Sequence, residues 1–132
     1  MNEKLTNKKC VPCEGGTPPL TKEEAKKLLS QVSASWYLNE NSPPHQTRNV
    51  QSFADGKIHR SGVGESISAD FKFKNFKEAM AFVNKVAVIA ESEGHHPDIY
   101  IYYSRVKLEL TTHAIGGLSI NDFILASKID AI

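Results

Sequence analysis

The sequence lacks the features that mark membrane, secreted and nucleic-acid-binding proteins. No run of apolar residues approaches the ~20 that a membrane-spanning helix needs. The first ten residues are polar and include lysines, and no apolar stretch follows them, so they do not resemble a secretory signal. The formal net charge is only +1, which gives no electrostatic reason to expect nucleic acid or an anionic membrane as the main partner. We therefore expect a cytoplasmic protein.

Cysteine is scarce as well, and the arrangement of the cysteines does not by itself exclude a metal or redox site. The only two cysteines are Cys10 and Cys13, in the sequence Cys-Val-Pro-Cys. A structural zinc site usually takes four ligands, and no second pair of cysteines exists. A thioredoxin-like pair would follow a strand and open a helix, whereas this pair lies in a leader rich in glycine and proline. We expect an ordinary N-terminal loop here, and a metal or redox role remains the alternative.

The length of the chain and the positions of its glycine- and proline-rich segments predict the domain organisation. A chain of 132 residues is most simply one domain, with a core that needs no metal or disulfide. Residues 1–20 end in Gly-Gly-Thr-Pro-Pro and are expected to form a flexible leader, so that the folded domain covers residues 21–132. Residues 39–64 are polar and interrupted by glycine and proline, which predicts a loop or a long hairpin connection. His45 and His59 fall in that segment, and we expect no catalytic role for them.

The remaining segments show the two periodicities of regular secondary structure. Capping signals and 3.6-residue apolar spacing predict a helix over 21–32 that opens with Thr21 and Glu24, a helix over 75–94, and a last helix that opens with Ser119 and Asp122. Alternating or β-branched and aromatic residues predict strands over 36–38, 66–73, 99–103 and 106–113, the last two joined by a turn at 104–105. The order α-β-β-α-β-β-α predicts an α+β fold: one antiparallel four-stranded sheet with helices on one face.

The residues best suited to chemistry are adjacent histidines between the second helix and the third strand. His95 and His96 precede Pro97, which disfavours helical backbone at His96 and so places the pair outside the helix. Adjacent histidines rarely serve a core, and a junction held by rigid neighbours is a common place for functional side chains. We therefore interpret the pair as candidate site residues.

A third histidine, His113, ends the last predicted strand. Its alternation places it with Lys107, Glu109 and Thr111, opposite the apolar residues of that strand. His113 is then either a polar residue of the sheet face or, if the hairpin folds back, a neighbour of His95 and His96. Histidine changes its protonation near neutral pH, so three imidazoles suit either metal binding or acid–base chemistry.

Together these residues resemble the signature of a known family, the pterin-4a-carbinolamine dehydratases. The resemblance extends from about Leu20 to Ile129, although residues 39–64 are longer than expected and Ile99 stands where some relatives carry an aromatic residue. The matching elements are Glu91-x-x-x-His95-His96-Pro97, Tyr103, Thr112-His113, and Gly117-Leu118-Ser119 with Asp122.

The resemblance implies an activity and a set of site residues. Members convert 4a-hydroxytetrahydropterin, made by aromatic amino-acid hydroxylases, into quinonoid dihydropterin and water, without a metal or another cofactor. By motif position, His95 and His113 are the main proton-transfer residues, and His96 binds the pterin and assists. Pro97 and Asp122 belong to the substrate site, and Glu91, Tyr103 and Thr112 are expected to support it. Members are also homotetramers built as dimers of dimers, and animal members bind a homeodomain transcription factor.

Several alternatives stay open beside this interpretation. Asp122 lies three residues after Ser119, where a carboxylate completes a helix cap. Glu91 is equally compatible with a solvated helix residue. For the whole chain, the alternatives to a pterin lyase are a non-catalytic oligomerisation or transcriptional partner, and a metal-binding module that uses Cys10, Cys13 and histidines.

Overall fold

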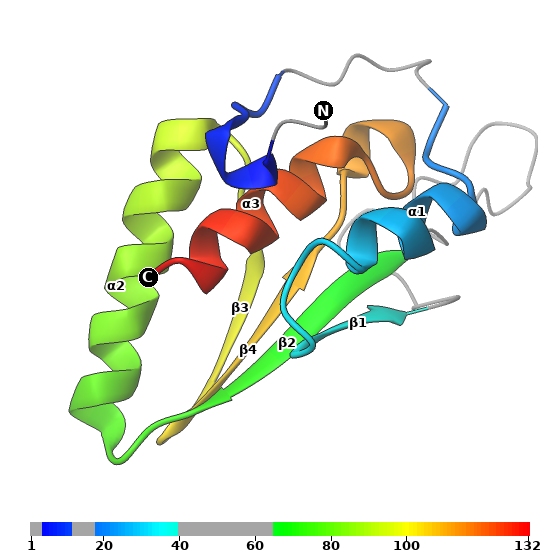
Figure 1. Cartoon of the computed structure of the whole chain (residues 1–132). Coiled ribbons are helices and arrows are strands. Elements are labelled where there is room, and N and C mark those ends of the chain that lie inside the picture. The colour runs from blue at the N-terminus through cyan, green and yellow to red at the C-terminus, as the bar shows by residue number, and fades with distance from the viewer. Residues whose placement is uncertain (1–3, 12–17, 40–64) are drawn as a thin grey trace, which may run out of the picture.

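The computed structural model describes residues 4–11, 18–39 and 65–132 (Figure 1). In chain order the elements are the 3-10 turn η1 (Leu5–Asn7), α1 (Lys22–Leu29), β1 (Trp36–Asn39), β2 (Ser66–Lys72), α2 (Phe76–Glu93), β3 (Asp98–Tyr102), β4 (Arg105–Leu110), η2 (His113–Ile115) and α3 (Ile120–Asp130). The predicted loop over 39–64, with His45 and His59, lies almost entirely outside the described residues.

The four strands form one antiparallel sheet in the order β1-β2-β4-β3, and the three α-helices cover one of its faces (Figure 1). Its central pair aligns apolar residues across the strands, with Ile67 opposite Leu110 and Ala69 opposite Leu108, all fully buried. Side chains of a strand alternate between faces, so this register places one apolar face under the helices. The predicted fold class is confirmed.

Each long helix begins with the cap that its sequence predicted. Thr21 and Glu24 form a capping box at α1, and Ser119 and Asp122 form one at α3. At α2 the side chain of Asn75 accepts a hydrogen bond from the backbone N–H of Glu78. These side chains satisfy N–H groups that the first turn of a helix leaves without partners.

Three boundaries differ from the prediction. Helix α1 ends at Leu29 instead of residue 32. The turn of the β3–β4 hairpin consists of Tyr103 and Ser104, because Tyr102 pairs with Arg105, and Tyr103 has a φ of +52°. The last strand ends at Leu110, so His113 lies in η2 and not on a strand. Strand alternation therefore does not decide where His113 points.

Helix α3 is the most deeply buried element. The four consecutive residues Phe123 to Ala126 are all buried, since α3 contacts α1, α2 and the N-terminal η1. Leu5 of η1 is itself a core residue. A helix enclosed on several sides needs apolar residues around its circumference, which explains its weak sequence periodicity.

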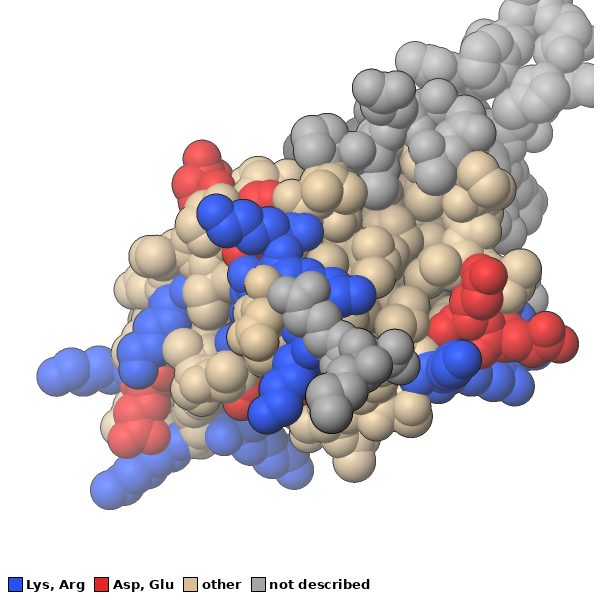
Figure 2. All heavy atoms as spheres, turned by 45° about the horizontal axis from the view of Figure 1, so that its top comes forward, with Lys and Arg blue, Asp and Glu red and all other residues tan. Residues whose placement is uncertain are grey.

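The surface carries charges of both signs. Figure 2 shows one face on which basic and acidic side chains both occur, in places next to one another, among uncharged residues. This mixture agrees with the formal net charge of +1. Among the described helices, none has the length and apolar character required to cross a bilayer.

Candidate active site

The ends of several elements enclose a cavity of about 600 Å³. Its walls come from the C-terminal end of α2, the link that follows it, residues 111–114 after β4, the start of α3, and the N-terminal segment. His95, His96 and His113 all line this cavity. Cavities of this size commonly hold a small-molecule ligand. The structure thus brings the three candidate histidines, which are distant along the chain, to one hollow.

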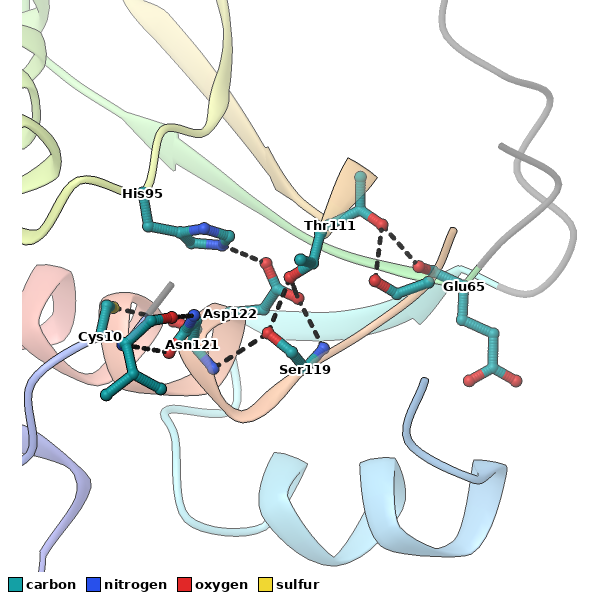
Figure 3. A network of polar contacts seen from close by, with 10 residues as sticks. Cys10, Glu65, His95, Thr111, Ser119, Asn121 and Asp122 are labelled. Atoms are coloured by element: carbon teal, nitrogen blue, oxygen red, sulfur yellow. Dashed lines mark hydrogen bonds and ion pairs between the residues drawn. The ribbon is translucent and has the colours of Figure 1, made fainter. Parts of the chain in front are cut away.

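His95 is held by a buried carboxylate. Gly94 ends α2 in the left-handed conformation, with a φ of +64°, and turns the chain so that His95 leaves the helix. The Nε2 atom of His95 lies 2.6 Å from Oδ1 of Asp122, whose side chain is 0% exposed. Figure 3 shows the imidazole pointing at this carboxylate. A carboxylate oxygen accepts hydrogen bonds, so this contact favours the tautomer of His95 that carries its hydrogen on Nε2 and directs Nδ1 away from Asp122.

The other oxygen of Asp122 anchors it to its own helix and to the end of β4. Its Oδ2 accepts hydrogen bonds from the backbone N–H of Ser119 and from the hydroxyl of Thr112, both at 2.9 Å. Thr112 and Ser119 are also joined by their hydroxyls at 2.7 Å. Asp122 is therefore both the carboxylate of the α3 capping box and the partner of His95, so the two expected roles coexist.

His96 and Glu91 form a second pair, at the open side of the cavity. Nε2 of His96 lies 2.9 Å from Oε2 of Glu91, and the side chains are 62% and 83% exposed. Exposed pairs of this kind contribute little to stability because water screens them. This imidazole is available to a ligand that enters from solvent.

His113 lies in the short turn η2, directly after the β4 end. Gly116, with a φ of +68°, ends this turn, and Thr112 bridges to Gly117 across it. His113 is exposed, which fits a side chain on the wall of an open cavity. The turn bends the chain back towards the link after α2, and this places His113 at the cavity. A continued strand would have carried His113 away in a straight line.

Three expected site residues are not among those that line the cavity: Asp122, which is fully buried and contacts His95, and also Pro97 and Tyr103. Pro97 is half-buried and directly precedes β3. Tyr103 lies at the far end of β3, where it is exposed and its ring stacks on Phe76 at 6.4 Å. Five residues of extended strand separate Tyr103 from the histidine link, so it does not reach the cavity of its own chain.

Sequence reasoning did not place four further residues at this cavity: Cys10, Val11, Glu93 and Asn121. Glu93 is 11% exposed and forms an ion pair with Lys128. That hydrogen bond, and a second one from the backbone N–H of Cys10, hold the pKa of Glu93 below its ordinary value of 4.5. Burial, with the negative charge of Glu93, raises the pKa of the Cys10 thiol to about 12. Their spacing in the sequence does not indicate that these residues meet, because their contacts join segments that are far apart along the chain.

Metal ligation has limited support in this region. Within residues 4–11, 18–39 and 65–132, no three histidine, cysteine or carboxylate side chains are grouped as metal ligands would be. Cys13 lies outside the described residues.

Comparison with known proteins gives one consistent family. The sequence model described as pterin 4 alpha carbinolamine dehydratase matches residues 18–132. A relative from Nitrosomonas eutropha, which carries the family's name as a provisional one, is 45% identical over 97% of this chain and 92% of its own length. One from Alkaliphilus metalliredigens, named in the same way, is 40% identical over 96% and 93%. The crystal structure of a transcriptional coactivator/pterin dehydratase from Brucella melitensis aligns with a TM-score of 0.61 and 27% identity, over 86% of this chain and 96% of that one.

Proposed function

The chain belongs to the pterin 4 alpha carbinolamine dehydratase family, and we propose that it removes water from a 4a-hydroxytetrahydropterin by histidine acid–base catalysis. The observation that supports this proposal most directly is the shared cavity of His95, His96 and His113. The product would be a quinonoid dihydropterin, so the enzyme would regenerate the pterin cofactor of aromatic amino-acid hydroxylases. The reaction as proposed requires no metal or other cofactor.

The chemistry calls for one proton donor and one proton acceptor. The C4a–O bond breaks, and the departing hydroxyl takes up a proton and leaves as water. The electron pair of the N5–H bond forms the N5=C4a double bond, and that proton passes to a base. We assign these two transfers to His95 and His113, since imidazole can donate or accept a proton near neutral pH.

The neighbouring residues would orient these groups. Asp122 is fully buried and bonded through both oxygens, so it would act through His95 as a positioning residue and would not contact the pterin. Thr112 would hold Asp122 in turn. His96, with Glu91 beside it, would bind the pterin at the open side of the cavity. Pro97 would fix the backbone that presents both adjacent histidines.

The test is the rate of dehydration of a synthetic 4a-hydroxytetrahydropterin. His95→Ala and His113→Ala are each expected to lower kcat about 100-fold or more, as expected when a general acid or base is lost. His45→Ala and His59→Ala are matched controls, because the same substitution is made in a segment with no expected catalytic role. Rates of the His95 and His113 variants equal to those of the wild type would disprove the assignment.

A second function has support from one comparison. The Brucella melitensis structure is described as a transcriptional coactivator as well as a pterin dehydratase. A non-catalytic partner protein would have no need of the three histidines. If the purified wild type fails to accelerate dehydration, this alternative replaces the enzymatic one.

We also propose that the protein assembles as a homotetramer, as the family resemblance implies. Exposed apolar side chains support this proposal. Val88 on α2 is 70% exposed, and Tyr102 and Tyr103 lie exposed at the β3 end. Such side chains are costly to leave in water when they group into patches.

A further inference from the structure

The N-terminal segment, residues 4–11, is bonded to the same helix turn that carries Asp122, the carboxylate partner of His95. Its Leu5 is buried, and the backbone N–H of Cys10 donates to Oε2 of Glu93 at 2.9 Å. The backbone N–H of Val11 donates to Oδ1 of Asn121 at 3.0 Å, and the amide of Asn121 donates back to the carbonyl of Val11. The side chain of Asn121 thus holds Val11 much as a neighbouring strand would.

This attachment places Cys10 and Val11 on the cavity that contains the three histidines. Asn121 directly precedes Asp122, the partner of His95, and both belong to the first turn of α3. Figure 3 shows Cys10 beside Asn121, and the ring of His95 pointing at the carboxylate of the adjacent Asp122. The two leader residues, called here the Cys10–Val11 wall, therefore lie close to the proton-transfer group.

The surface that this wall offers to a ligand is apolar. The N–H of Cys10 and both the N–H and the carbonyl of Val11 are bonded to protein groups. The thiol of Cys10 donates to the carbonyl of Asn121 at 3.6 Å, and its pKa of about 12 keeps it neutral. What remains is the sulfur and the isopropyl group of Val11, which is 60% exposed. Sulfur and branched carbon favour contact with a flat ring over hydrogen bonds to its edge.

We propose that the Cys10–Val11 wall packs against the bicyclic ring of the bound pterin and that Asn121 positions this wall. The proposal rests on the proposed function, because it takes the cavity to be the pterin site. It assigns a binding role to two leader residues that lie outside the histidine motif. The edge of the ring, with its donors and acceptors, would then be bound by other walls of the cavity.

The test separates substrate binding from catalysis in Val11→Ala. Loss of two methyl groups from the contact is expected to raise KM about 5- to 10-fold while kcat changes less than about 2-fold. The dissociation constant of 6-methyl-7,8-dihydropterin should rise by the same factor. This probe has the bicyclic ring, cannot lose water, and carries only a methyl group as its side chain. Because Val11 is exposed, the thermal midpoint should not change.

Thr6→Ala is the matched control, since Thr6 is an exposed residue of the same segment that does not line the cavity. It should leave KM and the dissociation constant unchanged. If Val11→Ala also leaves both values unchanged, the wall does not contact the ring and the proposal is wrong. A wild type without dehydratase activity would instead disprove the proposed function, and the probe's dissociation constants would still test the wall.

The positioning role of Asn121 is tested by a double-mutant cycle. Asn121→Ser removes the two bonds to Val11 and should weaken binding of the same probe. If Asn121 acts through the wall, adding Val11→Ala to Asn121→Ser should cost clearly less than Val11→Ala costs alone. Fully additive losses would show that Asn121 acts on the site without the wall, or on stability only, and would overturn that part of the proposal.

Discussion

Asp122 shows how one side chain can serve folding and chemistry together. Its Oδ2 closes the capping box of α3, while its Oδ1 receives the Nε2–H of His95. A carboxylate that is fully buried is costly unless each oxygen has a donor, and here three donors surround it. The same bonds that stabilise the helix start therefore fix the orientation of the candidate catalytic ring.

Asp122→Asn should consequently lower both stability and activity. An amide replaces one of the two acceptor oxygens with an NH2 group, which must face either His95 or the cap donors, so one set of hydrogen bonds is lost. We expect a loss of about 1–3 kcal/mol in the free energy of unfolding. We also expect kcat to fall by at least about 10-fold, because the imidazole loses its fixed tautomer. Denaturant unfolding and the dehydration assay measure the two effects.

Ser119→Ala is the matched control for this prediction. It removes the cap hydroxyl and should cost about 1 kcal/mol, but it leaves the contact between Asp122 and His95 in place. Its kcat should stay close to that of the wild type. An equal fall of kcat in both variants would mean that activity follows stability alone.

The site residues that could be predicted from the sequence lie in short motifs. The residues that were missed make contacts between segments that are far apart in the sequence. The histidine motif and Asp122 belong to short, dense segments whose residue types already indicate chemistry. Val11 and Asn121 are 110 positions apart and are ordinary residues by type. Their meeting depends on how η1 packs on α3, which no local pattern encodes.

At the scale of elements, helix starts were predictable because their capping signals are local. The three caps at Thr21, Asn75 and Ser119 agree with the structure. The course of the chain after β4 was not predictable in this way. Apolar alternation continues to Thr112, yet Thr112 bonds to Gly117 and Asp122 and turns the chain out of the sheet. Here tertiary bonds override the strand pattern.

The ion pair that connects α2 to α3 leads to a prediction about how stability depends on pH. Glu93, near the end of α2, pairs with Lys128 of α3 and accepts the N–H of Cys10, and these bonds lower its pKa in the folded state. A carboxyl whose folded pKa is lowered contributes stability that is fully present above the unfolded value near 4.5. That contribution is lost as the pH falls below 4.5 and passes through the folded pKa.

Glu93→Gln isolates this contribution. The difference in the free energy of unfolding between wild type and variant should be constant from pH 7 down to about 5 and should shrink at lower pH. Urea unfolding at several pH values provides the measurement. A difference that stays constant down to pH 3 would contradict the assigned role of the ion pair.

At the scale of the whole molecule, the helices and the sheet leave different surfaces uncovered. The inner face of the sheet is closed by α1, α2 and α3 (Figure 1), whereas Val88 of α2 is exposed. The hairpin end adds Phe76 stacked on Tyr103, also exposed. The sequence could indicate a core but not this outer distribution, because helical periodicity alone does not say which apolar residues remain exposed.

Assembly into a homotetramer predicts a solution mass of about four chains, with Val88 in a subunit contact. Val88→Glu places a charge in that contact, where burial without a partner is unfavourable, and should shift the mass towards smaller species. Gln31→Glu, at an exposed position after α1, adds the same charge elsewhere and should leave the mass unchanged. Light scattering with size-exclusion chromatography measures both. A wild type that elutes as a single chain would refute the tetramer, and a Val88→Glu variant that keeps the full mass would place the contact on another surface.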